Sequence, residues 1–362
     1  MIPIAKPLIG QEEQEAVKEV LGKSQIASGE YVERFEENFA HYLNSKYAVC
    51  TSNGTTALHT AMLAAGIGPG DLVITTPFSF IATSNAILYV GAKPIFADVL
   101  EDSFNIDPKK VEELILETQG EIKALVIVHL YGNPCEMGEI MEICEKYNII
   151  LIEDCAQSHG AAYKGKKAGT FGHAAIFSFY PTKNMTCGEG GVMVTDDKEI
   201  YEKAKKIINH GQQERYVHDM IGYNFRMTNI AAAIGIEQLK KLEGFNAKRI
   251  AHAQQYIEKL SPELYAVPTV KEDTTHVFNQ FTIRCKIDRN IVIEALMKAG
   301  IGYGLYYPHT LPEQPLYKEL GLEGVCPVAT RLSKEAISIP VHPALSDEDI
   351  QYVIDTLNSI NK

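Results

Sequence analysis

The segment Ile149-Ile150-Leu151-Ile152-Glu153-Asp154 consists of four apolar residues followed directly by two acids. A short, continuously apolar run is typical of a strand that is covered on both faces of a sheet. The two acids then follow the carboxyl end of this strand, which is the edge where open α/β sheets bind ligands. The segment therefore predicts a buried sheet and a site at one of its edges.

Similar strand-length runs rich in apolar residues occur on both sides of this segment. They cover residues 47–51, 72–76, 94–99, 124–130, 174–179 and 191–194. Helical patterns, with apolar residues three or four apart, lie between most of them, at residues 55–65, 79–90, 107–117 and 136–147. Strands that alternate with helices predict a mainly parallel, doubly wound sheet, here with seven strands and helices on both faces.

After Asp197 the sequence is richer in helical patterns. The expected elements are helices at residues 229–260, 288–299 and 346–361 and strands at 277–286 and 336–341. Ser346 and the three acids after it are a typical helix start, because a hydroxyl caps the first turn and acids favour its positive end.

These patterns predict two domains. We expect a large α/β domain over residues 1–248, with an N-terminal segment that can pack on the other domain. A smaller α+β domain is expected over residues 249–362. The length of 362 residues agrees with about two domains.

Composition and charge exclude several classes of protein. Lys and Arg total 34 against 46 Asp and Glu, a net charge of −12 that argues against binding nucleic acid or an anionic membrane. No apolar stretch approaches the ~18 residues of a membrane span, and the N-terminus resembles no export signal, so we expect a cytoplasmic protein. The seven cysteines and eleven histidines show no metal-ligand spacing, which predicts reduced thiols and no metal site.

The segment Ser52-Asn53-Gly54-Thr55-Thr56-Ala57-Leu58 follows the first predicted strand and opens a helix. Free backbone N–H groups, a glycine that permits close approach and two hydroxyls could hold a phosphate. An ordinary capped helix start explains the same residues equally well.

Two further segments could carry chemistry. Asp154 could hold a protonated ring nitrogen, although a helix-capping role would account for it as well. Lys183 follows the predicted strand 174–179 in an apolar loop bounded by glycine, where loss of water would favour its neutral amine. A solvated surface lysine is the alternative. An anion cradle, a strand-end acid and a lysine loop on one sheet are together what a pyridoxal phosphate enzyme needs.

Several motifs resemble the DegT/DnrJ/EryC1/StrS group of fold-type I aminotransferases, which transfer amino groups to nucleotide-linked keto sugars. The resemblance covers essentially the whole chain. The motifs are Ser28-Gly29, Phe35-Glu36, Ser52-Asn53-Gly54-Thr55, Glu153-Asp154-Cys155-Ala156-Gln157, Phe177 to Lys183, Gly188-Glu189-Gly190-Gly191 and Gly222-Tyr223-Asn224-Phe225-Arg226-Met227.

The resemblance implies pyridoxal 5'-phosphate as cofactor and assigns roles to individual residues. Lys183 would bind the cofactor covalently and move the proton during transfer. Asp154 would hold the ring nitrogen, Gln157 would contact the phenolic oxygen, and Phe80 would stack on the ring, although Phe80 also fits a buried core aromatic.

Further roles concern the phosphate and the subunit interface. The residues that would hold the phosphate are Gly54, Thr55, Thr56 and Ser178. Asn224 would reach it from a neighbouring subunit, so the resemblance implies a homodimer with its active site at the interface.

The sequence departs from the family pattern at two places. Cys187 stands where relatives commonly have threonine. In the loop Tyr306-Tyr307-Pro308-His309, relatives often have histidine at the position of Tyr306, and Pro312 replaces a second histidine. This loop contacts sugar in the family, so Tyr306 and His309 are candidate substrate residues, with structural packing as the alternative.

The resemblance thus predicts transfer of an amino group from L-glutamate to a keto sugar nucleotide for amino-sugar and polysaccharide synthesis. The Tyr-Tyr-Pro loop resembles those of enzymes that aminate carbon 3 of UDP-linked 3-oxo-N-acetylhexosamine derivatives. Amination at carbon 4 of a UDP- or dTDP-4-keto-6-deoxyhexose is the alternative, and a non-catalytic regulatory protein on the same fold is another. A related dehydratase branch has histidine in place of the lysine, and Lys183 argues against it.

Overall fold

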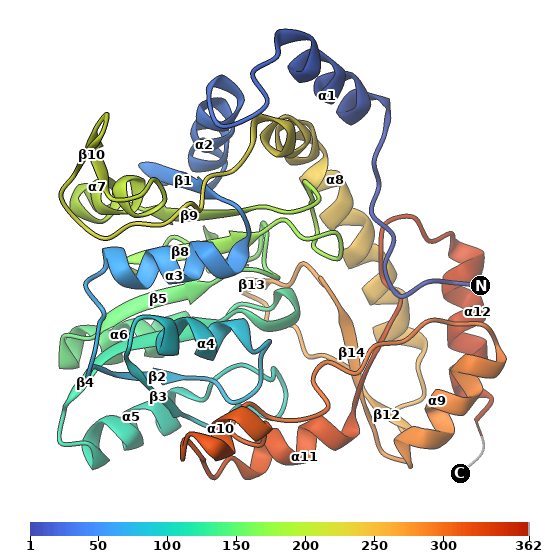
Figure 1. Cartoon of the computed structure of the whole chain (residues 1–362). Helices are drawn as coiled ribbons and strands as arrows, with labels where there is room; N and C mark the ends of the chain where they lie inside the picture. The colour runs from blue at the N-terminus through green and yellow to red at the C-terminus, as the bar shows by residue number, and fades with distance from the viewer. Residues whose placement is uncertain (361–362) are drawn as a thin grey trace.

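The computed structural model describes residues 1–360, and a seven-stranded sheet forms its centre (Figure 1). The strands, in spatial order, are β1 (Tyr47–Thr51), β9 (Gly191–Thr195), β8 (Ala174–Ser178), β5 (Ile150–Asp154), β4 (Ile122–Val128), β2 (Leu72–Thr75) and β3 (Lys93–Phe96). Neighbours are parallel except at β9, which runs antiparallel to both β1 and β8. The predicted α/β fold with a mainly parallel sheet is confirmed.

The helices divide into those that the sequence predicted and those that it did not. The predicted ones are α3 (Gly54–Ala64), α4 (Ala82–Tyr89), α5 (Pro108–Glu117), α6 (Met137–Tyr147), α8 (Asn229–Lys259), α9 (Arg289–Lys298) and α12 (Asp347–Asn358). The additional ones are α1 (Gln11–Lys23), α2 (Glu30–Leu43), α7 (Lys198–Ile207), α10 (Pro315–Glu319) and α11 (Pro327–Glu335). Ser346 caps α12 as expected, and Asn361, the predicted end of that helix, lies outside the described residues.

The helices cover both faces of the sheet, because successive strand residues point to opposite sides. Val49 and Val126 pack against α3, α4 and α7 on one face. On the other face Cys50 packs against α2 and α8, and Leu125 packs against α5 and α6. All of these side chains are buried, which explains why the strands are almost continuously apolar.

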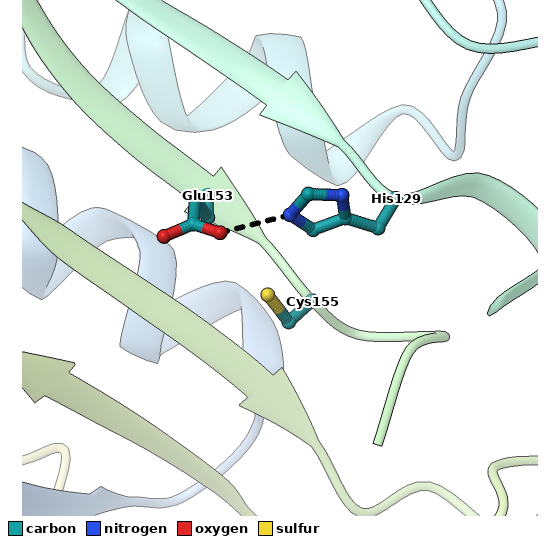
Figure 2. Close-up of side chains that lie close together, drawn as sticks. All are labelled: His129, Glu153 and Cys155. Carbon is teal, nitrogen blue, oxygen red and sulfur yellow. Dashed lines mark hydrogen bonds and ion pairs between the residues drawn. The ribbon is translucent and has the colours of Figure 1, made fainter. Parts of the chain in front are cut away.

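Glu153, a charged residue in the middle of this buried sheet, is held by hydrogen bonds (Figure 2). One carboxylate oxygen accepts the Nε2–H of His129 at 2.9 Å and the N–H of Gly169 at 2.8 Å. The other accepts the N–H groups of Phe171 and Gly172, each at 2.7 Å. Burial raises the pKa of Glu153, but these bonds outweigh it and hold the pKa below its usual value. The carboxylate thus joins β4, β5 and the turn at residues 169–172.

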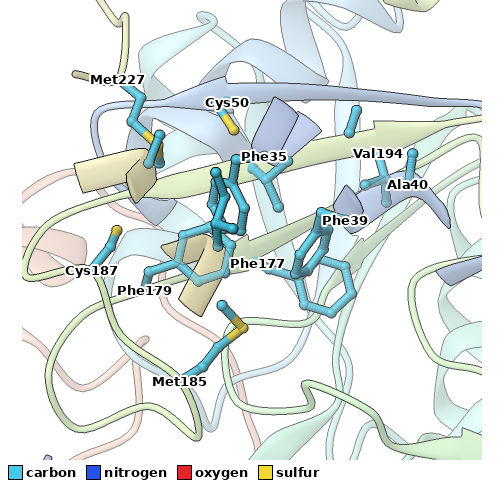
Figure 3. Packing of buried hydrophobic residues seen from close by; sticks show 14 of the residues in the cluster. Phe35, Phe39, Ala40, Cys50, Phe177, Phe179, Met185, Cys187, Val194 and Met227 are labelled. Carbon is cyan, nitrogen blue, oxygen red and sulfur yellow. The ribbon is translucent and has the colours of Figure 1, made fainter. Parts of the chain in front are cut away.

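An aromatic cluster fixes the end of β8 (Figure 3). Phe39 of α2 lies edge-on to Phe177 and Phe179, with ring centres 5.0 and 5.5 Å apart. Phe35 packs on Phe179 at 5.2 Å and fits against Gly235 of α8, where a Cβ atom would lie 2.7 Å from its ring. The cluster therefore positions the loop that follows β8.

A second core lies in the C-terminal part of the chain. The three-stranded sheet of β12 (Tyr265–Ala266), β14 (Phe281–Cys285) and β15 (Ala336–Ile339) packs against α9, α12 and the end of α8. Ile2 joins this core and pairs with Ile301, and the N-terminus lies beside α12 (Figure 1). Because α8 spans both cores, we propose that the domains divide within this helix, where the sequence-based boundary at 248/249 also falls.

Not all of the C-terminal part belongs to the second core. Tyr317 of α10 lies edge-on to Phe96 of β3, with ring centres 5.7 Å apart. The carboxylate of Asp98, just after β3, accepts the N–H groups of Val328 and Ala329 and so caps α11. Helices α10 and α11 thus return to the edge of the large sheet.

The remaining strands are short and lie outside the two main sheets. They are β6 (Ala162–Tyr163), β7 (Lys166–Lys167) and β13 (Thr274–Thr275), which pair with one another, and the hairpin of β10 (Gln212–Glu214) and β11 (Val217–His218). Of the helices in residues 1–360, none is both long enough and apolar enough to span a membrane.

We predict that Glu153→Gln lowers the free energy of unfolding by about 3 kcal/mol, because the amide places an N–H₂ group against backbone N–H donors in a buried position. Urea unfolding followed by circular dichroism measures this change. Glu139→Gln, at an exposed position on α6, is the control and should change stability by less than about 0.5 kcal/mol. Equal stability of the two variants would contradict the prediction.

Candidate active site

Three strand ends meet at the carboxyl edge of the large sheet. Thr51 at the end of β1 pairs with Gly191, and Gly191 pairs on its other side with Ser178 at the end of β8. Asp154 ends β5, which neighbours β8. The sequence-predicted cradle, acid and lysine loop therefore leave the same edge of the sheet, as expected from the run 149–154.

The first turn of α3 packs directly onto these strand ends. A Cβ atom on Gly54 would lie 2.7 Å from Cβ of Ser178, and one on Gly191 would lie 2.4 Å from the carbonyl oxygen of Asn53. Real Cβ atoms do not approach so closely. Glycine at both positions is thus what brings the start of the helix against Ser178.

This helix start has hydrogen-bond donors to offer an anion. Asn53 caps α3 by accepting the N–H of Thr56, while Thr56 Oγ1 accepts the N–H of Asn53. Within residues 1–360, the N–H groups of Gly54 and Thr55 and the Oγ of Ser178 form no hydrogen bond. The two readings of this segment, capped helix and anion cradle, are therefore compatible, because different groups serve each.

Asp154 is buried and forms no ion pair within the described chain. Its Oδ1 accepts the N–H of Ala156 at 3.0 Å, and its Oδ2 accepts the hydroxyl of Thr83 at 2.9 Å. Burial raises the pKa of this carboxyl, while the two hydrogen bonds and the charge of Lys183 oppose the rise. A buried carboxylate of this kind is suited to receive a proton-bearing ring nitrogen.

Lys183 lies in the loop after β8 and is half-buried. Loss of water around the ammonium lowers its pKa to about 8, although the negative charge of Asp154 acts in the opposite direction. A much larger share of this amine is therefore neutral near neutral pH than in a solvated lysine, whose pKa lies near 10.4.

A network of buried asparagines holds the lysine loop. Asn184 donates through Nδ2 to Asn246 Oδ1 on α8 at 2.8 Å and to the carbonyl of Val277 at 3.0 Å. Asn279 donates to Asn184 Oδ1 at 2.9 Å and to the carbonyl of Thr182 at 3.2 Å. The carbonyl of Thr182 and the side chain of Asn184, on either side of Lys183, are thus bonded to α8 and to the segment before β14.

Gln157 and Phe80 lie near Tyr307. Gln157 accepts the backbone N–H of Tyr131 at 2.7 Å and donates through Nε2 to Tyr307 Oη at 3.2 Å, which fixes the orientation of its amide. The ring of Phe80 lies 6.4 Å from that of Tyr307 and is 58% exposed. Exposure argues against the core-aromatic interpretation of Phe80.

The positions of Tyr306 and His309 say less about a role in binding substrate. The Tyr306 ring packs over Gly304, and its carbonyl accepts the hydroxyl of Tyr131. His309 is exposed. Tyr307 was not selected as a site residue from the sequence. It is nevertheless the residue of this loop that contacts a predicted site residue, Gln157.

Asn224 is exposed, in the segment after the β10–β11 hairpin. This segment runs beside the start of α3 in the same chain, where the N–H of Ser52 donates to the carbonyl of Phe225 at 2.7 Å. Asn224 itself forms a backbone bridge with Asn209.

Sequence reasoning also missed Thr83 and Asn184. Both act by orienting other groups, so their types alone gave no chemical signal. Asn184 directly follows Lys183, and its position beside the lysine was the available clue.

His129, Glu153 and Cys155 are close enough together to suggest metal ligands (Figure 2). Both nitrogens of His129 are already used, because Nδ1 accepts the N–H of Cys135 at 3.0 Å and Nε2 faces Glu153. Burial raises the pKa of the Cys155 thiol, which keeps it protonated. These residues therefore have a structural role and stabilise the ends of β4 and β5.

Comparisons with known proteins agree with this geometry. The sequence model of the DegT/DnrJ/EryC1/StrS aminotransferase family matches residues 7–358. A pleiotropic regulatory protein from Geobacillus stearothermophilus is 40% identical over 344 residues, which are 94% of this chain and 91% of the relative. GDP-perosamine synthase from Escherichia coli O157:H7 is 37% identical over 99% of this chain and 98% of its own.

Another relative is UDP-4-amino-4,6-dideoxy-N-acetyl-beta-L-altrosamine transaminase from Campylobacter jejuni, which is 36% identical over 99% of this chain and 97% of its own. Among solved structures, Helicobacter pylori PseC, an aminotransferase involved in the biosynthesis of pseudoaminic acid, has a TM-score of 0.92 at 31% identity over 98% of both chains. The PLP form of the putative sugar aminotransferase Spr1654 from Streptococcus pneumoniae has a TM-score of 0.93 at 27% identity, over 99% of this chain and 98% of its own.

These findings confirm the enzyme class, the fold type and the pyridoxal 5'-phosphate cofactor predicted from the sequence. The roles of individual residues, the exact substrate and the dimer stay predictions. The chain belongs to the DegT/DnrJ/EryC1/StrS aminotransferase family.

Proposed function

We propose that this chain transfers an amino group from L-glutamate to a keto group on a nucleotide-linked sugar. The observation that carries the proposal is that Lys183, whose pKa is lowered, and the buried carboxylate of Asp154 follow neighbouring strands at the same edge of the sheet. Relatives with sugar transaminase and synthase names match almost the whole chain and support the substrate class. We also propose a cytoplasmic location and a role in polysaccharide synthesis.

The residues at the sheet edge fit pyridoxal phosphate. The start of α3 offers unused N–H groups to a phosphate from Gly54 and Thr55, and Ser178 adds a hydroxyl. Thr56 contributes by holding the cap in place. Asp154 would balance the positive ring nitrogen, Phe80 would cover one ring face, and Gln157 would donate to the phenolic oxygen.

The bound cofactor supplies an electron-withdrawing ring that stabilises negative charge on the carbon next to the amine. The protein supplies the rest. Asp154 would keep the ring nitrogen of the bound cofactor protonated, because loss of that proton would leave the buried carboxylate without a counter-charge. Lys183 accepts and returns a proton at Nζ, which its lowered pKa allows near neutral pH.

We propose that the active form is a homodimer. The hairpin region exposes large apolar side chains, namely Tyr216, Val217 and Ile221. Such a patch favours contact with another protein surface. Asn224 follows this patch directly and is exposed, so its amide is available to a site on a second subunit.

The position of the new amine has two candidates. Likeness of the Tyr306-Tyr307-Pro308 loop to those of carbon-3 enzymes favours a UDP-linked 3-oxo-N-acetylhexosamine derivative. Amination at carbon 4 of a UDP- or dTDP-4-keto-6-deoxyhexose is favoured by the Campylobacter relative, whose name specifies a 4-amino sugar.

A regulatory role without catalysis is a further candidate, because the Geobacillus relative is named a pleiotropic regulatory protein. Retention of Lys183, Asp154, Gln157 and the helix start favours an enzyme. A Lys183→Ala variant that still performed its role in cells would favour the regulatory function.

We predict that the holoenzyme reacts with an amino sugar nucleotide in the reverse direction. A UDP-linked 3-amino-N-acetylglucosamine and a UDP-linked 4-amino-6-deoxy analogue are mixed with it separately, and the visible absorbance of the cofactor is recorded. A change with the first sugar only supports carbon 3, and a change with the second only supports carbon 4. No change with either sugar, in protein that responds to glutamate, would contradict the proposed substrate class.

We predict that cofactor-free protein binds pyridoxal phosphate covalently faster as the pH rises, with the rate levelling off above about pH 8. Only the neutral amine of Lys183 reacts, and its pKa is about 8 because of its burial. Absorbance at a series of pH values measures the rate. Lys183→Ala should remove the covalent step, and a rate that keeps rising to pH 10 would contradict the lowered pKa.

We predict that Asp154→Asn lowers kcat at least 100-fold while leaving the fold intact, because an amide cannot keep the ring nitrogen charged. Steady-state kinetics with the accepted sugar measure the loss. Asp102→Asn, in the turn after β3, is the control and should keep its activity. Unchanged kcat in Asp154→Asn would contradict the role of this carboxylate.

A further inference from the structure

Arg249 is a buried cation in the middle of α8. Its side chain is part of a residue that is only 5% exposed. Its Nη1 donates to the carbonyls of Phe278 at 3.2 Å and Asn279 at 3.1 Å. Nε is also buried and has no hydrogen-bond partner among residues 1–360. Within residues 1–360, the edge of the guanidinium formed by Nε and Nη2 therefore donates no hydrogen bond.

No carboxylate of the described chain forms an ion pair with Arg249. Burial alone lowers its pKa to about 10, and no acid offsets this effect. The positive charge of Arg249 also contributes to lowering the pKa of His159, His252 and His342, after the larger effect of their own burial. Arg249 is thus a buried charge that lacks a counter-charge, which is costly unless an anion binds.

Arg249 lines a small cavity that Lys183 also lines. Lys6 from the N-terminal segment and Gln238 from α8 complete the polar part of its wall. Asn279 connects the two cations, because its carbonyl accepts from Arg249 while its amide donates to the carbonyl of Thr182, next to Lys183. The wall of this cavity therefore carries cations and no acid.

We propose that Arg249 binds a carboxylate of the amino donor, with the Nε and Nη2 groups donating to its two oxygens. Guanidinium and carboxylate match in this paired geometry, and the bond is stronger because both groups are charged. Arg249 lines the same cavity as Lys183, the lysine proposed to carry the cofactor. This inference rests on the proposed aminotransferase function and adds the residue that recognises the donor.

The contacts of Arg249 also contribute to the stability of the folded protein. Its two carbonyl bonds join α8 to the segment before β14, so a substitution could loosen that contact as well as remove the anion site. Arg249→Lys keeps the positive charge and loses the paired geometry, whereas Arg249→Met loses both. Lys248→Met is a matched control, because Lys248 is the exposed neighbour on the same helix.

The first test measures binding without chemistry. Glutarate has the two carboxylates of the donor but no amine, and its dissociation constant for the holoenzyme is measured by calorimetry. We expect the constant to rise at least tenfold in Arg249→Lys and further in Arg249→Met, and to change less than twofold in Lys248→Met. Melting curves and cofactor absorbance verify that each variant is folded and loaded, and Arg249→Lys decides if Arg249→Met does not fold.

The second test separates the two halves of the reaction. We expect the apparent KM for L-glutamate to rise at least tenfold in Arg249→Lys, with the half-reaction of the amino sugar within twofold of the wild type. Glutarate binding that is unchanged in Arg249→Lys, or an equal loss in both half-reactions, would overturn the inference. If glutarate binding depends on Arg249 but no sugar reacts with the wild type, the substrate proposal fails while the carboxylate site stands.

Discussion

The close packing of the first turn of α3 against the ends of β8 and β9 is the constraint on which the site depends. Gly54 and Gly191 have no side chains, so the helix start reaches within contact of Ser178. A Cβ atom at either position would separate the helix from the sheet edge. The N–H groups of Gly54 and Thr55 would then lie farther from Ser178, and these are the groups proposed to hold an anion together.

The site is built from charges that the protein leaves without partners of its own. Among residues 1–360, Asp154 is buried without a cation in ion-pair distance, and Arg249 is buried without an ion pair to an acid. Each such charge is costly in the empty protein. A ligand that brings the opposite charge removes this cost, so cofactor and donor binding should also stabilise the folded chain. By contrast, the carboxylate of Glu153 is fully hydrogen-bonded within the protein, so it does not gain from binding a ligand.

The sequence predicted the large sheet well because its strands are buried on both faces. Continuous apolar runs such as residues 149–152 have few other interpretations in a chain that alternates strands with helices. The acids and the lysine that follow these runs were therefore placed at the correct edge. The antiparallel direction of β9 was not predicted, because a short loop after Lys183 is compatible with either direction.

The missed features depend on contacts between distant residues. The orientation of Gln157 is set by Tyr131 and Tyr307, which lie far from it in sequence. The sequence singled out Tyr306 because of its place in a family pattern, whereas Tyr307 is the neighbour whose hydroxyl meets Gln157. Helix α2, which carries Phe35 and Phe39 of the aromatic cluster, was also not predicted, because its role depends on contacts with Phe177 and Phe179, which are distant in sequence.

Helix α8 connects the loop that carries Lys183 with Arg249. It is 31 residues long, which corresponds to about 46 Å of continuous helix. Asn246, which holds the lysine loop, and Arg249 lie three residues apart and so face the same side. One inserted residue between them would turn Arg249 by about 100° around the axis. The number of residues between Asn246 and Arg249 therefore sets the position of Arg249 relative to the loop that carries Lys183. Insertions or deletions in this helix should be tolerated far less than in the surrounding loops.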